Sequence, residues 1–218
     1  MIVALNKSVD WTSFDVVKKV RTLTGERKVG HAGTLDPFAE GVLVIGIGRE
    51  STRKLGQISA ASKDYMAKLK LGAETDTLDL TGEVIKRRRI PHLTEGQIES
   101  VFAQFSGEIE QTPPMYSAKK INGTRLYKLA RRGEKIDRDP VTIQIHSLDL
   151  IDLSHDAITF SVTCGKGTYI RQLACDMANA LGTAGHLTAL RGTRVADYRL
   201  DDCLTFDLLE RQWMSTVV

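Results

Sequence analysis

Apolar positions follow a helical spacing in some segments of this chain and alternate in others. The clearest helical pattern places Ile98, Val101, Phe102 and Phe105 on one face. It starts after a capping-box spacing at 94–97 and stops at Gly107. Two more helices are predicted, over about 13–23 and 170–181. The first has a cap at Thr12 or Ser13, an apolar face built on Phe14, Val17 and Val20, and a stop at Gly25.

Other segments alternate with a period of two or are rich in branched residues, as strands are. They cover residues 42–47, 65–71, 141–153 and 158–164. Strands and helices interleave irregularly, so the sequence predicts an α+β fold with a mixed, largely antiparallel central sheet flanked by helices. Because no repeat or flexible linker interrupts the chain, we expect one catalytic domain over 1–218.

Composition places the chain among packed globular proteins. It has 218 residues, 42% hydrophobic and 26% charged. Cys164, Cys175 and Cys203 lack the close pairing of zinc or redox motifs, so we expect reduced thiols. No basic leader and no apolar run long enough to span a bilayer is present, and a cytoplasmic location is expected.

Charge is unevenly distributed. The whole chain carries +3, whereas the segment 119–138 holds eight basic residues against two acidic ones. The basic residues are Lys119, Lys120, Arg125, Lys128, Arg131, Arg132, Lys135 and Arg138. Tyr116 and Tyr127 lie beside or among them, and cations with stacking rings are typical of nucleic-acid surfaces. We expect a basic RNA-binding insertion at about 109–138. The shorter run at 86–89 is interpreted as a solvated face.

Asp36 is the most informative carboxylate in the sequence. It precedes Pro37, which disfavours helical torsions, and it follows a loop that contains Gly30 and Gly33. A buried strand follows. This setting suits a carboxylate that a rigid scaffold holds for chemistry. It also suits a turn aspartate that bonds to its own backbone, and local spacing does not decide between the two.

A set of motifs distributed over nearly the whole chain resembles the TruB family of pseudouridine synthases, which act on uridine 55 in the T loop of tRNA. The motifs are Thr12-Ser13, Gly30-His31 with Gly33-Thr34-Leu35-Asp36-Pro37, Gly41-Val42-Leu43, Lys63 with Tyr65, Leu71-Gly72, Thr75-Asp76-Thr77 with Asp79, Pro114-Met115-Tyr116-Ser117-Ala118 with Lys120, Leu126-Tyr127, and Lys166-Gly167-Thr168-Tyr169-Ile170-Arg171. Two departures occur. Lys7-Ser8-Val9-Asp10 replaces the family's Lys-Pro-x-Gly, and Ala32 stands where a threonine is common.

The resemblance implies roles for individual residues. Asp36 becomes the catalytic carboxylate, Tyr65 the ring that stacks on the uracil, and Arg171 the partner that keeps Asp36 ionised. Tyr169 then lines the uracil pocket. A strand spacing would place Tyr169 and Arg171 on one face. For Tyr65 the competing interpretation is a tyrosine packed in the core, and for Arg171 it is a structural ion pair.

The remaining predicted RNA contacts follow from the resemblance and from the basic segment. His31 is expected to stabilise the rearranged T loop, and Leu190 to pack under the uracil, although core packing is the simpler interpretation of a leucine. The others are Lys63, Tyr116, Lys119, Lys120, Arg125, Lys128, Arg131 and Arg132. Asp76 and Asp79 are interpreted as turn-capping residues rather than metal ligands.

The implied reaction detaches uracil at N1 and rejoins it through C5, so no cofactor and no metal is expected. Asp36 could attack the ribose, add to the uracil ring, or take a ribose proton. Two rival functions are a tRNA-binding module without turnover and a magnesium-dependent phosphohydrolase that uses Asp36 or the Asp76 and Asp79 pair. Only about 15 residues follow the stretch 201–204. We therefore expect no C-terminal PUA domain, no obligate protein partner and recognition mainly of the T arm.

Overall fold

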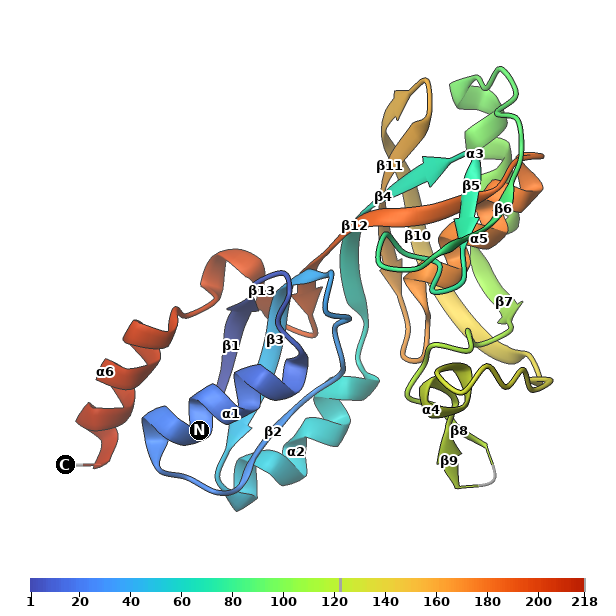
Figure 1. Cartoon of the computed structure of the whole chain (residues 1–218). Helices are drawn as coiled ribbons and strands as arrows, with labels where there is room; N and C mark the ends of the chain where they lie inside the picture. The colour runs from blue at the N-terminus through green and yellow to red at the C-terminus, as the bar shows by residue number, and fades with distance from the viewer. Residues whose placement is uncertain (122, 218) are drawn as a thin grey trace. The chain divides into compact units, whose positions relative to one another are not determined.

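In the computed structural model, which describes residues 1–121 and 123–217, the chain divides into two units. Unit 1 comprises Met1–Met66 and Ala189–Val218, and unit 2 comprises Ala67–Thr188. Strands β4 (Lys63–Leu71) and β12 (Gly185–Val195) contribute residues to both. Figure 1 labels the elements of each unit.

Unit 1 is organised around strand β3, whose residues from Gly41 to Ile47 are all buried. Strand β3 pairs antiparallel with β1 and β2 and parallel with β12. The elements of unit 1, besides its parts of β4 and β12, are β1 (Ile2–Lys7), α1 (Ser13–Thr24), β2 (Val29–His31), β3 (Glu40–Ile47), α2 (Arg49–Ala60), β13 (Tyr198–Arg199), the 3-10 turn η1 (Leu200–Asp202) and α6 (Phe206–Val217).

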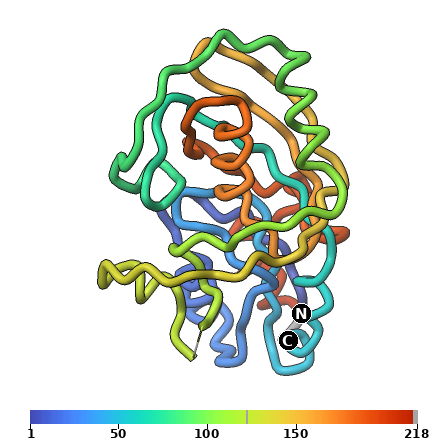
Figure 2. The backbone as a smooth tube through the Cα atoms, turned by 90° about the vertical axis from the view of Figure 1, so that its right-hand side faces the viewer, coloured from blue at the N-terminus to red at the C-terminus, as the bar shows by residue number. Residues whose placement is uncertain are grey.

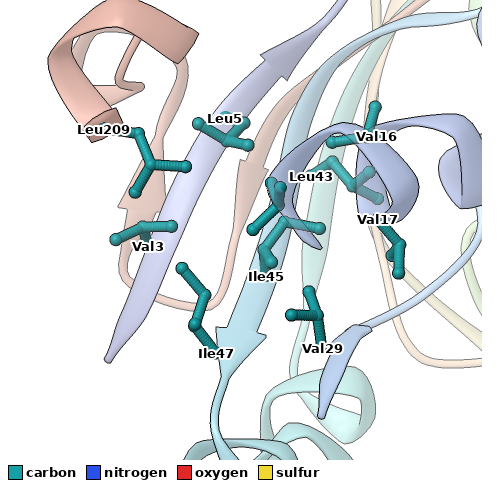
Figure 3. Close-up of a cluster of buried hydrophobic side chains, with 10 residues drawn as sticks. Val3, Leu5, Val16, Val17, Val29, Leu43, Ile45, Ile47 and Leu209 are labelled. Carbon is teal, nitrogen blue, oxygen red and sulfur yellow. The ribbon is translucent and has the colours of Figure 1, made fainter. Parts of the chain in front are cut away.

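Both faces of β3 carry apolar side chains because helices cover both of them. One face sends Leu43, Ile45 and Ile47 into a cluster with valines of α1 and with Leu209 of α6 (Figure 3). The other face sends Val42 and Val44 against Leu55 of α2. The uniformly apolar run that predicted this strand reflects burial on both sides.

Helix α1 confirms the predicted boundaries and corrects the predicted face. Thr12 caps it through a capping box with Asp15, and Gly25 ends it in the left-handed conformation, with φ 69°. Phe14, however, is 50% exposed, whereas Val16 is buried beside Val17 and Val20. The expectation that Phe14 faces the core was wrong. Its ring instead lies under the Lys18 ammonium, 5.1 Å from the ring centroid.

Unit 2 contains the strand order β4-β11-β10-β7. Strand β10 pairs antiparallel with both β11 and β7, and the long β10 and β11 hairpin is visible in the yellow to orange part of the tube in Figure 2. The elements of unit 2 are β5 (Ala73–Thr75), β6 (Val84–Arg87), α3 (Glu95–Gln104), β7 (Gly107–Gln111), β8 (Lys120–Ile121), β9 (Thr124–Arg125), α4 (Leu126–Ala130), β10 (Val141–Ser154), β11 (Ala157–Cys164) and α5 (Ile170–Ala180).

The predicted fold class is confirmed, because the central strands pair mainly antiparallel and helices flank them. All three predicted helices and all four predicted strands exist within a few residues of their expected bounds. Strands β1, β7 and β12 and helices α2 and α6 had no counterpart in the sequence prediction. The single catalytic domain and its basic insertion stay predictions.

Two other findings bear on the sequence expectations. Cys164 and Cys175 are buried and Cys203 is half-buried, and none of the three forms a disulfide within the described residues. Among the described residues, no helix combines the length and apolarity that crossing a membrane requires.

Candidate functional site

Asp36 lies in the loop between β2 and β3, where it is half-buried. Leu35 before it and Phe38 after it are both buried, at 7% and 6% exposure. The backbone oxygen of Asp36 accepts a hydrogen bond from the Ala39 amide at 3.1 Å, which closes a turn. Asp36 therefore stands between two apolar anchors on a short, folded loop.

The N-terminal segment of unit 1 holds the backbone of this loop. The hydroxyl of Ser13 accepts from the Leu35 amide at 3.0 Å and donates to the Leu35 carbonyl at 3.2 Å. On the other side of Asp36, the Asp10 amide donates to the Pro37 carbonyl at 2.8 Å. Asp10 adopts a left-handed φ of 65°, a conformation that the family's usual glycine at this point reaches more easily.

Lys7 is the most unusual side chain of unit 1, since it is charged and only 1% exposed. Its ammonium donates to the carbonyls of Trp11 at 2.7 Å and Ala39 at 2.5 Å, and to those of Ser8 and Pro37 at 3.0 and 3.4 Å. Burial lowers the pKa of Lys7 from 10.5 to about 8, although the nearby Asp36 carboxylate opposes that fall. A buried cation thus neighbours the candidate catalytic carboxylate.

Two glycines bring β12 against the same loop. A Cβ at Gly41 would overlap the carbonyl oxygen of Gly192, so these backbones touch directly. At Gly192, a Cβ would lie 3.7 Å from side-chain atoms of both Leu35 and Tyr65. The ring of Tyr65 and the side chain of Leu35, the residue before Asp36, therefore both lie beside Gly192 in unit 1. Leu190 lies two residues earlier on β12 and is buried, at 6% exposure.

His31 and Lys63 have partners of their own near this loop. The His31 ring contacts the Gly33 carbonyl through Nδ1, and its backbone pairs with Ile45 of β3. The Lys63 ammonium donates to the carbonyls of Ser59 and Ala61 at 2.8 and 2.9 Å. Its side chain also passes near Gly33, since a Cβ there would lie 3.8 Å from Lys63 Cε. Both residues support the loop that leads to Asp36.

Arg171 is the organising cation of unit 2. It is 4% exposed, and its Nε lies 3.6 Å from Asp79 Oδ2. It also donates to the carbonyls of Thr77 at 2.5 Å and Tyr116 at 2.9 Å. The guanidinium thereby joins helix α5 to two loops that are distant in sequence. Its predicted role toward Asp36 stays a prediction.

Tyr169 and Arg171 do not share a strand face, which corrects that part of the sequence interpretation. Tyr169 is the N-terminal cap residue of α5, and Arg171 lies in its first turn. The helical pattern that begins at Ile170 overrides the two-residue spacing. The side chain of Gln111, 2% exposed, accepts from the Tyr169 amide at 2.9 Å and donates to its carbonyl at 3.1 Å. Tyr169 is therefore held by a strand of the neighbouring sheet.

Asp76 and Asp79 are turn-capping residues, as predicted. Asp79 Oδ1 accepts from the hydroxyls of Thr77 and Thr81 and from the Thr81 amide at 2.8, 2.5 and 2.9 Å. Asp76 accepts from the Glu83 amide at 2.9 Å and from the Tyr116 hydroxyl at 3.0 Å. This bond to a carboxylate raises the pKa of Tyr116. In the described ranges, no group of three or more His, Cys, Asp or Glu side chains could hold a metal ion.

The basic segment forms the β8 and β9 hairpin followed by helix α4. Leu126 and Leu129 of α4 are buried, so they anchor the segment. Among its cations, Lys120, Arg125, Lys128, Arg131, Arg132 and Lys135 are exposed, whereas Lys119 and Arg138 are half-buried. Arg131 lies over the ring of Tyr127, 5.5 Å from its centroid, and Arg132 pairs with Glu134 at 2.8 Å. Most of the positive charge faces solvent.

Sequence reasoning missed Lys7 and Ser13 as supports of the Asp36 loop in unit 1 and Gln111 as a support of Tyr169 in unit 2. Each bonds to a residue between 22 and 58 positions away in addition to any local partner. A polar residue at the end of the apolar run Ile2–Lys7 was the one available signal for Lys7. Ser13 was weighed as a helix cap, but that role belongs to Thr12.

Comparison with known proteins agrees with this architecture. Residues 21–170 match the N-terminal domain of the TruB family of pseudouridylate synthases. The chain is 45% identical over 210 residues to tRNA pseudouridine synthase B of Francisella philomiragia, a match that covers 96% of this chain and 69% of that protein. It is 46% identical over 217 residues to tRNA pseudouridine synthase B of Paenarthrobacter aurescens, covering 97% and 70%.

Among solved structures, a chain in a crystal structure of a Cbf5-Nop10-Gar1 complex superposes with a TM-score of 0.74 at 26% identity. That match covers 100% of this chain and 56% of the other, so this chain spans little more than half of it. Fold and matches together define a pseudouridine synthase, an isomerase that rearranges uridine in RNA. Because the family match covers more than half of its residues, the chain belongs to the TruB family of pseudouridylate synthases.

Proposed function

We propose that this chain isomerises uridine 55 in the T loop of tRNA to pseudouridine, with Asp36 as the catalytic carboxylate. The observation that carries the proposal is the setting of Asp36. Hydrogen bonds from Ser13, Asp10 and Lys7 fix the backbone on both sides of it, and the Tyr65 ring flanks the same loop next to Gly192. A turn aspartate with no chemical role needs no such support. The tRNA substrate comes from the relatives' names, and it implies a cytoplasmic location.

Every bond broken and formed in the proposed reaction lies within the uridine itself, apart from the exchange of protons. The bond from ribose C1′ to uracil N1 breaks, the bond from C1′ to C5 forms, the C5 proton leaves, and N1 gains a proton. Oxidation state does not change, and no group arrives from outside. A uridine inside a folded loop must first be extruded from its stack, at a cost of roughly a few kcal/mol, before a carboxylate can reach it.

The family resemblance supplies the remaining roles. Tyr65 stacks on the flipped uracil, Tyr169 lines its pocket, and Arg171 keeps the Asp36 carboxylate ionised. Leu190 packs under the base, His31 supports the rearranged T loop, and Lys63 contacts the RNA. From the charge distribution, Tyr116 contacts the RNA beside a set of cations that bind its phosphates, namely Lys119, Lys120, Arg125, Lys128, Arg131 and Arg132. Exposure of most of these cations supports that assignment.

Substitution of Asp36→Asn tests the proposal, because it keeps the size of the side chain and removes its charge. We expect the variant to bind unmodified tRNA as the unchanged protein does and to lose about 1,000-fold or more of its turnover. Turnover is measured as tritium released from uracil C5, followed by mapping of the modified position. Asp197→Asn, an exposed aspartate in the turn after β12, is the matched control and should retain activity.

Retained turnover in Asp36→Asn would exclude Asp36 as the essential carboxylate. A binding module without turnover predicts no tritium release from the unchanged protein. A phosphohydrolase predicts strict dependence on magnesium, whereas we expect full isomerase activity in excess chelator. The Asp76 and Asp79 pair is a poor basis for that rival, since both carboxylates already accept hydrogen bonds from neighbouring hydroxyls and amides.

A further inference from the structure

Ser13 is a buried residue at the start of α1 whose hydroxyl takes no part in capping the helix. The capping bonds belong to Thr12 and Asp15. Ser13 is only 3% exposed, and its hydroxyl makes two hydrogen bonds with one residue 22 positions away. It accepts from the Leu35 amide and donates to the Leu35 carbonyl. One hydroxyl thus satisfies both backbone polar groups of the residue that precedes Asp36.

We propose that Ser13 is a positioning residue for Asp36, acting through the backbone of Leu35. The proposal rests on the function proposed above, in which Asp36 is catalytic. Leu35 is buried at 7% exposure, so water has little access to replace a missing partner. Without the hydroxyl, the Leu35 amide and carbonyl would have to turn toward other partners. Any such turn moves the Asp36 Cα, because the peptide bond links the Leu35 carbonyl to Asp36.

Hydrogen bonds to the residues that follow Asp36 fix the loop on its C-terminal side. The Pro37 carbonyl accepts hydrogen bonds from the Asp10 amide and the Lys7 ammonium. The Ala39 carbonyl accepts one from the Lys7 ammonium. A loop fixed only after Asp36 can still pivot about that fixed end. Ser13 fixes the other end. A displacement of about 1 Å at a reacting group can cost on the order of 100-fold in rate without weakening substrate binding.

The competing view is that Ser13 merely stabilises the fold. Under that view its removal lowers the melting temperature and leaves the rate of the folded enzyme unchanged. Under the positioning view the rate of the chemical step falls in folded protein that binds tRNA normally. The two views therefore differ in how rate, affinity and stability change together.

The test compares Ser13→Thr with Ser13→Val, because these two side chains have the same shape and differ in the hydroxyl. Each variant is assayed for the single-turnover rate of tritium release at saturating enzyme, for tRNA affinity and for thermal stability. Ser51→Ala is the matched control. Ser51 is also a buried serine of unit 1, at 8% exposure, and its hydroxyl accepts from the amino group of Met1 at 2.8 Å.

We expect Ser13→Val to lower the single-turnover rate by about 10- to 100-fold, with tRNA affinity within about twofold of the unchanged protein. Ser13→Thr should retain most of the rate, and Ser51→Ala all of it, even if both are somewhat less stable to heat. Equal rates in the Thr and Val variants would overturn the proposal. So would a decrease of tRNA affinity in Ser13→Val as large as its decrease of rate.

Failure of a variant to fold also has a defined meaning. If Ser13→Val unfolds at the assay temperature, Ser13→Ala replaces it, and its single-turnover rate is compared with that of Ser13→Thr. If neither Ser13→Val nor Ser13→Ala folds while Ser13→Thr does, the hydroxyl serves folding and the positioning role is overturned. Asp36→Asn is measured in parallel. Turnover in Asp36→Asn would defeat the proposed function itself, whereas inactive Asp36→Asn with a fully active Ser13→Val would defeat only the role of Ser13.

Discussion

The guanidinium Nε of Arg171 lies 3.6 Å from Oδ2 of Asp79, and these side chains are only 5% and 6% exposed. Removing one carboxylate from a buried ion pair leaves the remaining charge with less compensation for its desolvation. We therefore expect Asp79→Ala to destabilise the protein by roughly 3–5 kcal/mol, measured by urea unfolding. Asp156→Ala is the control, since Asp156 pairs with Lys70 at 44% exposure and such pairs contribute about 0–1 kcal/mol. Equal destabilisation in both variants would contradict this.

Lys7 should give activity and stability opposite dependences on pH. The pKa of Lys7 is lowered from 10.5 to about 8 by burial, so the folded protein releases this proton before the unfolded chain does. Between about pH 8 and 10.5 the unfolded chain binds more protons, and the contribution of Lys7 to stability rises with pH. The full effect is roughly 3 kcal/mol. Activity should fall through about pH 8, because neutral Lys7 holds the Pro37 and Ala39 carbonyls less strongly.

The check is a pair of profiles from about pH 7 to 10, one of single-turnover rate and one of unfolding free energy, for the unchanged protein and for Lys7→Met. Other groups titrate in this range, so the difference between the two proteins is the quantity of interest. Lys7→Met should lack both the fall in rate and the rise in stability that Lys7 causes. Parallel profiles in the two proteins would show that Lys7 does not titrate as proposed.

Gly41 and Gly192 should differ sharply in their tolerance of a methyl group. Gly41 has φ 112°, and a Cβ there would overlap the Gly192 carbonyl, so Gly41→Ala should cost roughly 2–4 kcal/mol. A Cβ at Gly192 meets its neighbours at 3.7 Å, an ordinary contact, so Gly192→Ala should change the stability little. Thermal unfolding of the two variants tests the contrast, and similar melting temperatures would contradict it.

The exposed cations of the basic segment should determine how strongly tRNA binding depends on salt. Arg125→Gln and Lys128→Gln each remove one exposed positive charge. If each of these cations neutralises one phosphate, its removal should make the negative slope of log affinity against log salt shallower by about 0.7–0.9. Arg211→Gln, at an exposed arginine of α6, makes the same charge change elsewhere and should leave the slope unchanged. Filter binding at several salt concentrations measures it, and equal slopes in all three variants would contradict the assignment.

Much of the fold was readable from local patterns. The capping box at Thr94 formed as its spacing predicts, and Thr12, one of two candidates, caps the first helix, because each satisfies amide groups of its own first helical turn. Strand β10 was predicted to within a residue, since alternating burial imprints a period of two on the sequence. Where two periods competed, at Tyr169 and Arg171, the longer helical pattern prevailed.

The sequence by itself determined the family and the identity of the candidate catalytic carboxylate, because a motif is defined by residue types and their order, which need no coordinates. Only the tertiary structure decided what holds that carboxylate. Ser13 and Lys7 support the backbone of this loop at residues that lie 22 and 32 positions away, and no local spacing encodes such partners. Buried polar groups choose partners by proximity after the chain has folded, so the supports of the site became visible only with the fold.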